Sequence, residues 1–381
     1  MHRFRSMSLL ATLAACSGVS ARPDRAEPDD LAVVQLGPGE LVELAHHVDA
    51  AMHEVMRRRY QEAESAALAA LALDPRSARA HAVLGMARMQ LAAQTTPADL
   101  QVANAAETEL RLAGKLAPDD AFVGFLSAVF LAETGHMSAA AAEAEAALAR
   151  AKDAPAAERA SLLGIAGTYR YELGEELAAR PHLEAYVALR PDDATAHFRL
   201  GSTLLRIAAV PQGARHRRFV DAQANAELAA RAFAQCCSLS PGDDDAAIAI
   251  ALALWRAGEL AQENGAAAAA EAHRKAAEDQ LHTVVTRFPQ NAEVWFRLGL
   301  IAEAKQQLAE AETAYLEALQ RAPAHIGSAL NLAALRDGRG DADGALVLWR
   351  RVLESDAAAP CLSARERQRL RARVHAPLGG S

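Results

Sequence analysis

The chain is dominated by paired segments in which apolar and small residues recur every three or four positions. The clearest pair lies between residues 291 and 325, where Trp295 and Leu298 share one helical face and Ala311 and Tyr315 share the next. This spacing predicts two amphipathic helices, because residues three and four positions apart lie on the same side of an α-helix. One such hairpin cannot bury its own apolar face, so the pattern also predicts neighbouring hairpins of the same kind.

The sequence of this pair resembles one tetratricopeptide (TPR) repeat. With Ala292 as position 1, the residues that carry the resemblance are Trp295, Leu298, Gly299, Ala311, Tyr315, Ala318 and Pro323. Their spacing fits the family's period of about 34 residues. Ala302 departs from the pattern, since the family often has Tyr there. The resemblance implies that small residues let the two helices approach, so Gly299 is expected where they cross.

Weaker copies of the pattern precede and follow this pair. They predict about eight hairpins between residues 41 and 357, with insertions at 91–100 and 207–222. The expected fold class is therefore all-α, an α-solenoid, and the resemblance implies a right-handed superhelix. Ser363 and Glu366 stand at capping-box spacing, and Leu370 and Val374 share one face, which predicts a capping helix within residues 358–381.

Composition and charge agree with a helical array. Of 381 residues, 51% are hydrophobic but only 4% are aromatic, so Ala and Leu supply most of the apolar character. Both residues favour helices over strands. The formal net charge of -8 argues against a nucleic-acid binder, because such proteins need cations to neutralise phosphates.

The N-terminus has a different pattern. Arg3 and Arg5 precede a short apolar run that ends in Leu-Ala-Ala-Cys at residues 13–16, which resembles the lipobox of bacterial lipoproteins. The resemblance implies a signal peptide at 1–15, a lipidated Cys16 that anchors the protein to a membrane, and a lean toward the outer membrane from Ser17. Residues 16–40 are rich in Pro, Gly and acid and are expected to form a disordered tether. The alternative is a disordered tail with one incidental cysteine.

A binding groove is the main functional expectation. In the family, positions 2, 5, 9 and 12 of each first helix largely face a concave groove, and here they are mostly apolar. The candidate groove residues are Met86, Met89, Phe122, Phe125, Phe198, Leu205, Ile248, Leu252, Trp255, Phe296 and Leu300. Such a lining suits the apolar face of an amphipathic helix or an extended hydrophobic peptide. The alternative is that these residues pack between successive first helices and meet no ligand.

Two groups of residues invite a chemical reading. His46, His47 and His53 lie on one predicted helix, but a second His four residues after the first, which a zinc-protease helix needs, is missing. Cys236 and Cys237 are adjacent and form no CxxC pair. Cys236 stands at a small core position and is predicted to be a buried thiol.

Basic clusters occur at residues 215–218 and 365–373. Each is predicted to be a solvated surface, with an acidic partner or an anionic surface as the alternative. The sequence contains no phosphate loop, nucleophile elbow or supported pair of carboxylates. We therefore expect no enzyme activity, no cofactor and no metal.

Two functions fit these features. The first is a lipid-anchored scaffold of the bacterial cell envelope, on the outer membrane facing the periplasm, that binds partner proteins while envelope complexes assemble. The second is a cytosolic adaptor that organises a signalling or biosynthetic complex. Four cysteines less a lipidated Cys16 leave three thiols, which is a mild objection to export.

Overall fold

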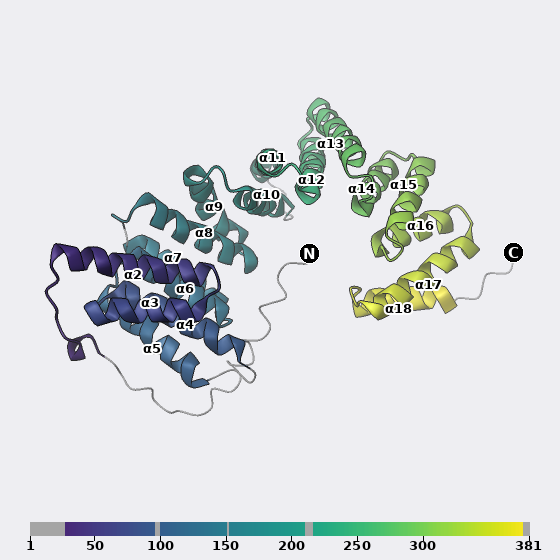
Figure 1. The fold of residues 1–381 in the computed structure, drawn as a ribbon. Coiled ribbons are helices and arrows are strands. Elements are labelled where there is room, and N and C mark those ends of the chain that lie inside the picture. Colours follow the sequence, from purple (N-terminus) through teal and green to yellow (C-terminus); the bar gives the residue numbers. More distant parts are fainter. Residues whose placement is uncertain (1–26, 96–99, 151, 210–215, 376–381) are drawn as a thin grey trace. The chain divides into compact units, whose positions relative to one another are not determined.

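A computed structural model describes residues 27–95, 100–150, 152–209 and 216–375 (Figure 1). In these ranges the chain forms helices and no strand. The helices α2 to α17 follow one another as eight consecutive pairs, and α18 comes after them. The predicted all-α repeat architecture is confirmed. The chain divides into two compact units, Met1–Thr203 and Leu204–Ser381, which we call unit 1 and unit 2.

Unit 1 contains four complete pairs and the start of the next helix. Its helices are α2 (Pro38–Met56), α3 (Tyr60–Leu73), α4 (Ala78–Gln94), α5 (Leu100–Leu116), α6 (Ala121–Glu133), α7 (Met137–Arg150), α8 (Ala156–Glu172), α9 (Glu176–Leu189) and the larger part of α10 (Ala194–Ala209). The two helices of each pair pack together, and the first helices also contact one another, α4 against α6 and α6 against α8. Since α2 also contacts α4, the first helices α2, α4, α6 and α8 form one continuous layer.

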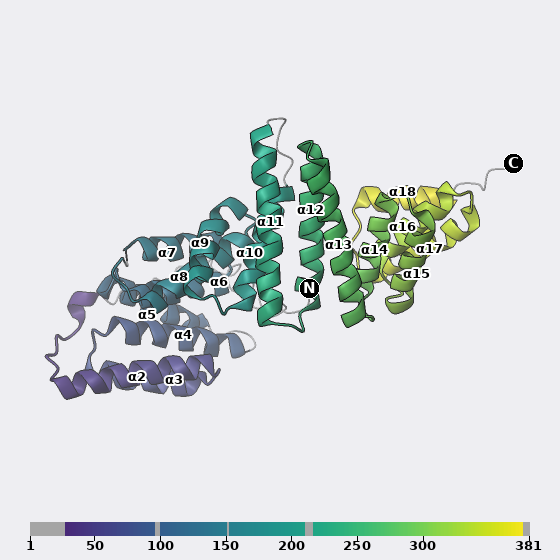
Figure 2. The same cartoon turned by 90° about the horizontal axis from the view of Figure 1, so that it is seen from above.

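Unit 2 begins inside α10 and ends with the capping helix. Its other helices are α11 (His216–Leu239), α12 (Asp244–Glu263), α13 (Ala267–Arg287), α14 (Ala292–Ala304), α15 (Leu308–Arg321), α16 (Ile326–Gly338), α17 (Ala342–Ala358) and α18 (Ala364–His375). Figure 2 shows α12 and α13 side by side along their length, and the two helices are in contact.

Glycines stand where the helices of a pair cross. A Cβ added to Gly299 would lie 2.6 Å from Cδ1 of Tyr315, whose side chain is fully buried. In the same way, a Cβ on Gly85 would lie 2.7 Å from Cγ of Leu110. Contacts this short leave no room for a side chain. The position predicted for Gly299 is therefore confirmed.

The inner turn contains a left-handed residue in the six pairs where the structure describes it. It is glycine in four pairs, at Gly135, Gly174, Gly265 and Gly340, with φ between 75° and 85°. Two pairs have a residue with a side chain instead, Arg58 at φ 60° and Gln306 at φ 61°. A side chain is strained in this region of φ, so these two turns are less favourable than the glycine turns.

The predicted tether needs a correction in its second half. Residues 27–40 are described, and Pro28–Asp30 forms a 3-10 helix, η1, that lies against α5. Lys115 forms an ion pair with Glu27 at 2.6 Å, and Arg76 donates a hydrogen bond to the Pro28 carbonyl at 2.9 Å. These contacts hold the segment on unit 1, and α2 already begins at Pro38. Residues 1–26, with the predicted signal peptide and Cys16, lie outside the described residues.

The C-terminal helix has the predicted cap. The Ser363 amide donates to Glu366 at 2.7 Å, and the Glu366 amide donates to the Ser363 hydroxyl at 3.3 Å. Leu370 is buried against the end of unit 2, and Val374 packs beside it. Asp356, which the sequence did not single out, accepts hydrogen bonds from the amides of Leu362 and Cys361 and from Arg367. These bonds, the backbone ones first, lower the pKa of Asp356.

Candidate functional site

A pocket of about 360 Å³ opens within unit 1. It lies among the first helices α6, α8 and α10 and the second helix α9. Its lining residues are Phe125, Ser161, Gly164, Ile165, Thr168, Leu183, Tyr186, Asp193, Ala196 and Arg199. Most of these residues belong to the layer of first helices, which is where the groove was expected.

A glycine gives the pocket its shape. Gly164 occupies position 5 of the first helix in the fourth pair, where the second pair has Ala82 and the third and the fifth to eighth pairs carry a large apolar side chain. The ring of Tyr186, on α9, lies next to Gly164. A Cβ on Gly164 would lie 3.0 Å from Cε2 of this ring. The hydroxyl of Tyr186 then donates to Asp193 at 2.8 Å. The ring is thus held as one wall of the pocket.

Asp193, just before α10, accepts a hydrogen bond on each of its two carboxylate oxygens. It accepts the Ala196 amide at 3.0 Å as well as the Tyr186 hydroxyl. Burial by itself would raise the pKa of this carboxyl, but the hydrogen bonds and the nearby charge of Arg199 outweigh it, so the pKa of Asp193 is lowered. Burial, followed by the hydrogen bond to Asp193, raises the pKa of Tyr186.

Arg199 is the other charged residue of the lining, and it is half-buried. Within the described part of the chain its guanidinium has no hydrogen bond or ion pair. The hydroxyl of Thr168, also half-buried, has no hydrogen bond there either. The pocket therefore combines an aromatic and aliphatic wall with one cation whose donors are unused. Neither Arg199 nor Thr168 was among the sequence candidates.

The structure separates the candidate groove residues into two groups. Met86, Met89 and Ile248 have exposed fractions of 5%, 2% and 3%, so they belong to the core. Their expected place on a partner-binding surface is corrected, because a buried side chain offers no area to a ligand. The half-buried group consists of Phe122, Phe125, Phe198, Leu205, Leu252, Trp255, Phe296 and Leu300.

Neighbouring side chains cover part of this second group. Phe125 packs against two core clusters and also lines the pocket. Arg79 lies over the Phe122 ring at 5.3 Å, and Arg274 lies over Trp255 at 5.9 Å. Phe296 contacts the next first helix, α16, where a Cβ on Gly327 would lie 3.0 Å from its ring. Packing between successive first helices therefore accounts for Phe296.

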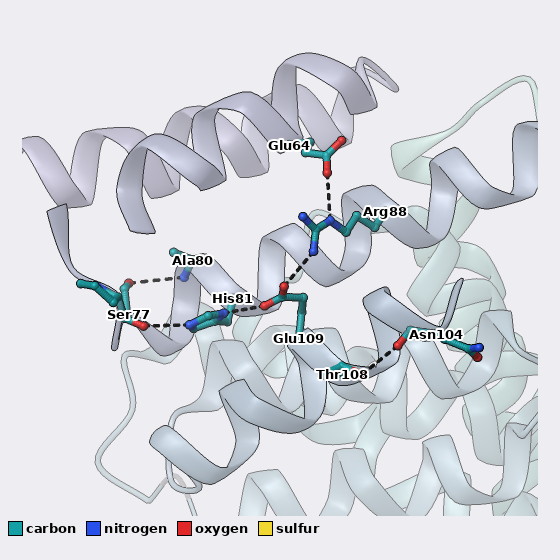
Figure 3. A network of polar contacts seen from close by, with 9 residues as sticks. Glu64, Ser77, Ala80, His81, Arg88, Asn104, Thr108 and Glu109 are labelled. Atoms are coloured by element: carbon teal, nitrogen blue, oxygen red, sulfur yellow. Dashed lines mark hydrogen bonds and ion pairs between the residues drawn. The ribbon is translucent and has the colours of Figure 1, made fainter. Parts of the chain in front are cut away.

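A polar network ties three helices together in unit 1 (Figure 3). The buried His81 lies 2.6 Å from a carboxylate oxygen of Glu109 and 2.9 Å from the Pro75 carbonyl. Arg88 bridges Glu109 and Glu64 at 2.7 and 2.8 Å. All of these charges are compensated within α3, α4 and α5 and the turn before α4. We therefore assign the network to the packing of the second pair and of the first pair against it, and not to ligand binding.

The remaining sequence candidates contribute no site. Cys236 is buried, as predicted, and Cys236, Cys237 and Cys361 are not joined in disulfides. In the described residues no group of three possible metal ligands comes together. In the cap, Arg367 and Arg373 pair with Asp356 and Asp337. Arg215 and the side chains of residues 216–218 lie outside the described part of the chain.

Among the described residues, no helix has the length and apolar character needed to cross a membrane.

Comparison with known proteins supports the repeat. Residues 292–325 match the family model of the tetratricopeptide repeat, so the predicted resemblance is confirmed for this stretch. No curated protein matches the sequence.

Solved structures with a similar fold have low sequence identity. Pseudomonas aeruginosa PilF is 16% identical, over 66% of this chain and 94% of its own, with a TM-score of 0.41. YrrB, described as a TPR protein with an unusual peptide-binding site, is 17% identical over 57% of this chain and 95% of its own, with a TM-score of 0.42. PilW, a type IV pilus biogenesis factor, is 18% identical over 67% of this chain and 96% of its own, with a TM-score of 0.40. At this identity, the similarity concerns the fold alone.

Proposed function

We propose that this protein is a binding scaffold that takes partner peptides or helices on the layer of its first helices, with the unit 1 pocket as its main contact. The observation that carries the proposal is the pocket itself, which combines an apolar wall with the unused donors of Arg199. Recognition of a peptide needs such a concave apolar surface with a few polar groups that fix orientation.

In unit 2, the proposed contact surface is formed by the half-buried Leu252, Trp255 and Leu300. Trp255 already donates a hydrogen bond from its ring to Glu259 at 3.2 Å, which orients the indole. Burying an exposed aromatic side chain under a ligand contributes roughly 1.5 to 3 kcal/mol to the binding free energy. Trp255→Ala is therefore expected to weaken capture of a partner that reaches unit 2 by about tenfold or more.

Site-specific crosslinking tests the pocket directly. A photoreactive benzoylphenylalanine replaces Ser161, which is exposed at the pocket, or Leu177, which is 78% exposed and does not line it. The cells that naturally make the protein are illuminated. The variant with the photoreactive residue at position 161 is expected to form a discrete crosslinked protein, and the variant with it at position 177 is not. Equal labelling from both positions, or none from either, would reject the pocket as the binding site.

We also propose that the scaffold is anchored in the bacterial envelope through a lipidated Cys16. The support is the lipobox at residues 13–16 together with the basic residues before it. Several acyl chains on one cysteine give stable anchoring where one chain is marginal. Cys16→Ser is expected to move the folded protein from the membrane fraction to the soluble fraction, and labelling with a radioactive fatty acid should disappear with it.

The second candidate function is that of a cytosolic adaptor, and the cysteines outside disulfides support it. Cys361 is exposed and Cys237 is half-buried, and neither is in a disulfide. Free thiols are typical of a reducing compartment. Wild-type protein that takes up no fatty acid and fractionates with the cytosol would favour this candidate, and the pocket proposal would be unaffected.

A further inference from the structure

The two charged residues of the pocket differ in their hydrogen bonding. Two charged residues line it, and Asp193 already accepts the Tyr186 hydroxyl and the Ala196 amide. Each of its two carboxylate oxygens therefore already accepts a hydrogen bond. Arg199 has five N–H donors and, within the described residues, none of them is in a hydrogen bond or ion pair.

Three other partly buried arginines of unit 1 are paired with carboxylates. Arg79 pairs with Asp120 and Glu158, and Arg88 pairs with Glu64 and Glu109. Arg170 likewise pairs with both Glu145 and Glu175. A partly buried guanidinium gains much more from a carboxylate partner than from water alone, because the pair is less screened there. Arg199 has the charge of Asp193 near it but forms no hydrogen bond or ion pair with a carboxylate of the described residues, and it lines an open cavity.

The proposed function provides the partner, and on that basis we propose that the pocket receives the side chain of an aspartate or glutamate from an internal, otherwise apolar, segment of the bound peptide. The carboxylate would accept from Arg199 and from the free hydroxyl of Thr168. Apolar residues next to it would lie on Phe125 and Ile165, which form the other wall.

Two features favour a side-chain carboxylate over other anions. A phosphate group carries nearly two charges and is usually held by several arginines, whereas this pocket has one, with Asp193 close by. A chain-terminal carboxylate is typically captured by free backbone amides. The amide of Ala196, at the start of α10, is already taken by Asp193.

The test begins with a selection on the full chain. A random peptide library, displayed so that no peptide has a free C-terminus, is selected on the wild type and on Arg199→Met. The wild type is expected to enrich one acidic position flanked by apolar residues, and the variant is expected to lose that acidic preference. Arg180→Met is the matched control, because it removes the same charge from α9 outside the pocket.

A double-mutant cycle then measures the contact. The best selected peptide is synthesised with its acidic residue, with the corresponding amide, and with the amide plus a free C-terminal carboxylate. Changing either Arg199 to Met or the acid to the amide should weaken binding about tenfold, and making both changes should add little more. The Arg180→Met control should bind all three peptides as the wild type does.

The outcomes separate the inference from the proposed function. In one outcome, peptides bind the wild type, Ser161→Trp blocks their binding, and Arg199→Met does not change it. This result would overturn the acidic contact but leave the scaffold proposal intact. Rescue by the free C-terminus would overturn it in favour of a terminal carboxylate. A selection that enriches nothing on the wild type, or peptides unaffected by Ser161→Trp, would overturn both.

Discussion

The fourth and seventh helix pairs follow the same design and differ at position 5 of their first helix. In the seventh pair this position is Phe296, whose ring lies 6.1 Å from that of Tyr315 and 5.0 Å from that of His325. The space between neighbouring first helices is filled there. In the fourth pair the position is Gly164, and the space stays open as the unit 1 pocket.

The comparison shows how a binding site arises in a repeat array. The sequence pointed to the large aromatic residues of the first helices, but Phe296 is used to join one pair to the next. The pocket lies where a side chain is absent, and a tyrosine from the second helix forms its wall. An aromatic residue in such an array thus marks packing as readily as recognition, whereas a glycine at position 5 leaves a concavity.

The largest effect should come from closing the tight crossing of the seventh pair. Gly299→Leu would place carbon atoms within the ring of the fully buried Tyr315, which has no free space to move into. We expect a loss of about 3 kcal/mol of unfolding free energy, the upper end for overpacking. Urea denaturation should show pairs six to eight losing stability together. A variant as stable as the wild type would contradict the crossing.

Filling the open site should affect binding more than stability. In Gly164→Leu, a Cβ at position 164 meets only the Tyr186 ring, at 3.0 Å, so the ring has to move only slightly, and the rest of the leucine side chain would enter the pocket. We expect stability close to that of the wild type and peptide binding weakened about tenfold or more. Calorimetric titration with a selected peptide and circular dichroism measure the two quantities. Binding that survives while the fold is intact would show that the pocket is not used.

Loss of the tyrosine hydroxyl should cost more unfolding free energy at the fully buried Tyr315 than at the half-buried Tyr186. Tyr315 donates to Glu303 at 2.7 Å and accepts from Asn331 at 3.2 Å, and its side chain is fully buried. Tyr315→Phe leaves both partners unsatisfied and should cost about 1 kcal/mol or slightly more, whereas Tyr186→Phe should cost less because water reaches Asp193. Equal losses of unfolding free energy in the two variants would contradict this ranking.

The pH dependence supplies an independent check on Tyr315. Burial, then the hydrogen bond to Glu303, raises its pKa above the ordinary value. The folded state therefore holds this proton more tightly, so the stabilisation is complete below the unfolded pKa of about 10 and is lost as the pH rises through the folded value. Tyr315→Phe should remove this part of the alkaline loss of stability.

The smallest effect should come from the turns of the same two pairs. Gln306 has φ 61° in the seventh pair, where the fourth pair has Gly174 at φ 75°. Gln306→Gly relieves a strained turn but adds flexibility to the unfolded chain, so we expect a net gain of about 0.5 kcal/mol. Gly174→Ala should cost a similar amount or more. Thermal melts of both variants give the comparison, and a destabilised Gln306→Gly would contradict it.

Local spacing was sufficient to predict the repeats. The spacing of apolar and small residues predicted paired helices, and the capping-box spacing of Ser363 and Glu366 predicted the last cap. The resemblance to the repeat family implied about eight pairs and the close approach at Gly299. These features depend on helical periodicity and on side-chain size, which are properties of residues near one another in the chain. The same information predicted the buried Cys236.

Tertiary packing decided what the groove became. Position 5 has the same helical phase in every pair, so its sequence alone does not show whether the next helix covers it, as at Phe296, or leaves it open, as at Gly164. The same holds for positions 9 and 12, where Met86 and Met89 stand, and these two residues and Ile248 at position 5 were expected on a surface but are core residues. In the sequence, nothing distinguishes Arg199 from other charged helical residues. In the structure, α6, α8, α9 and the start of α10 enclose the pocket that it lines. Whether a side chain is buried, paired or left facing a cavity depends on residues far away in the sequence, and the fold alone brings them into contact.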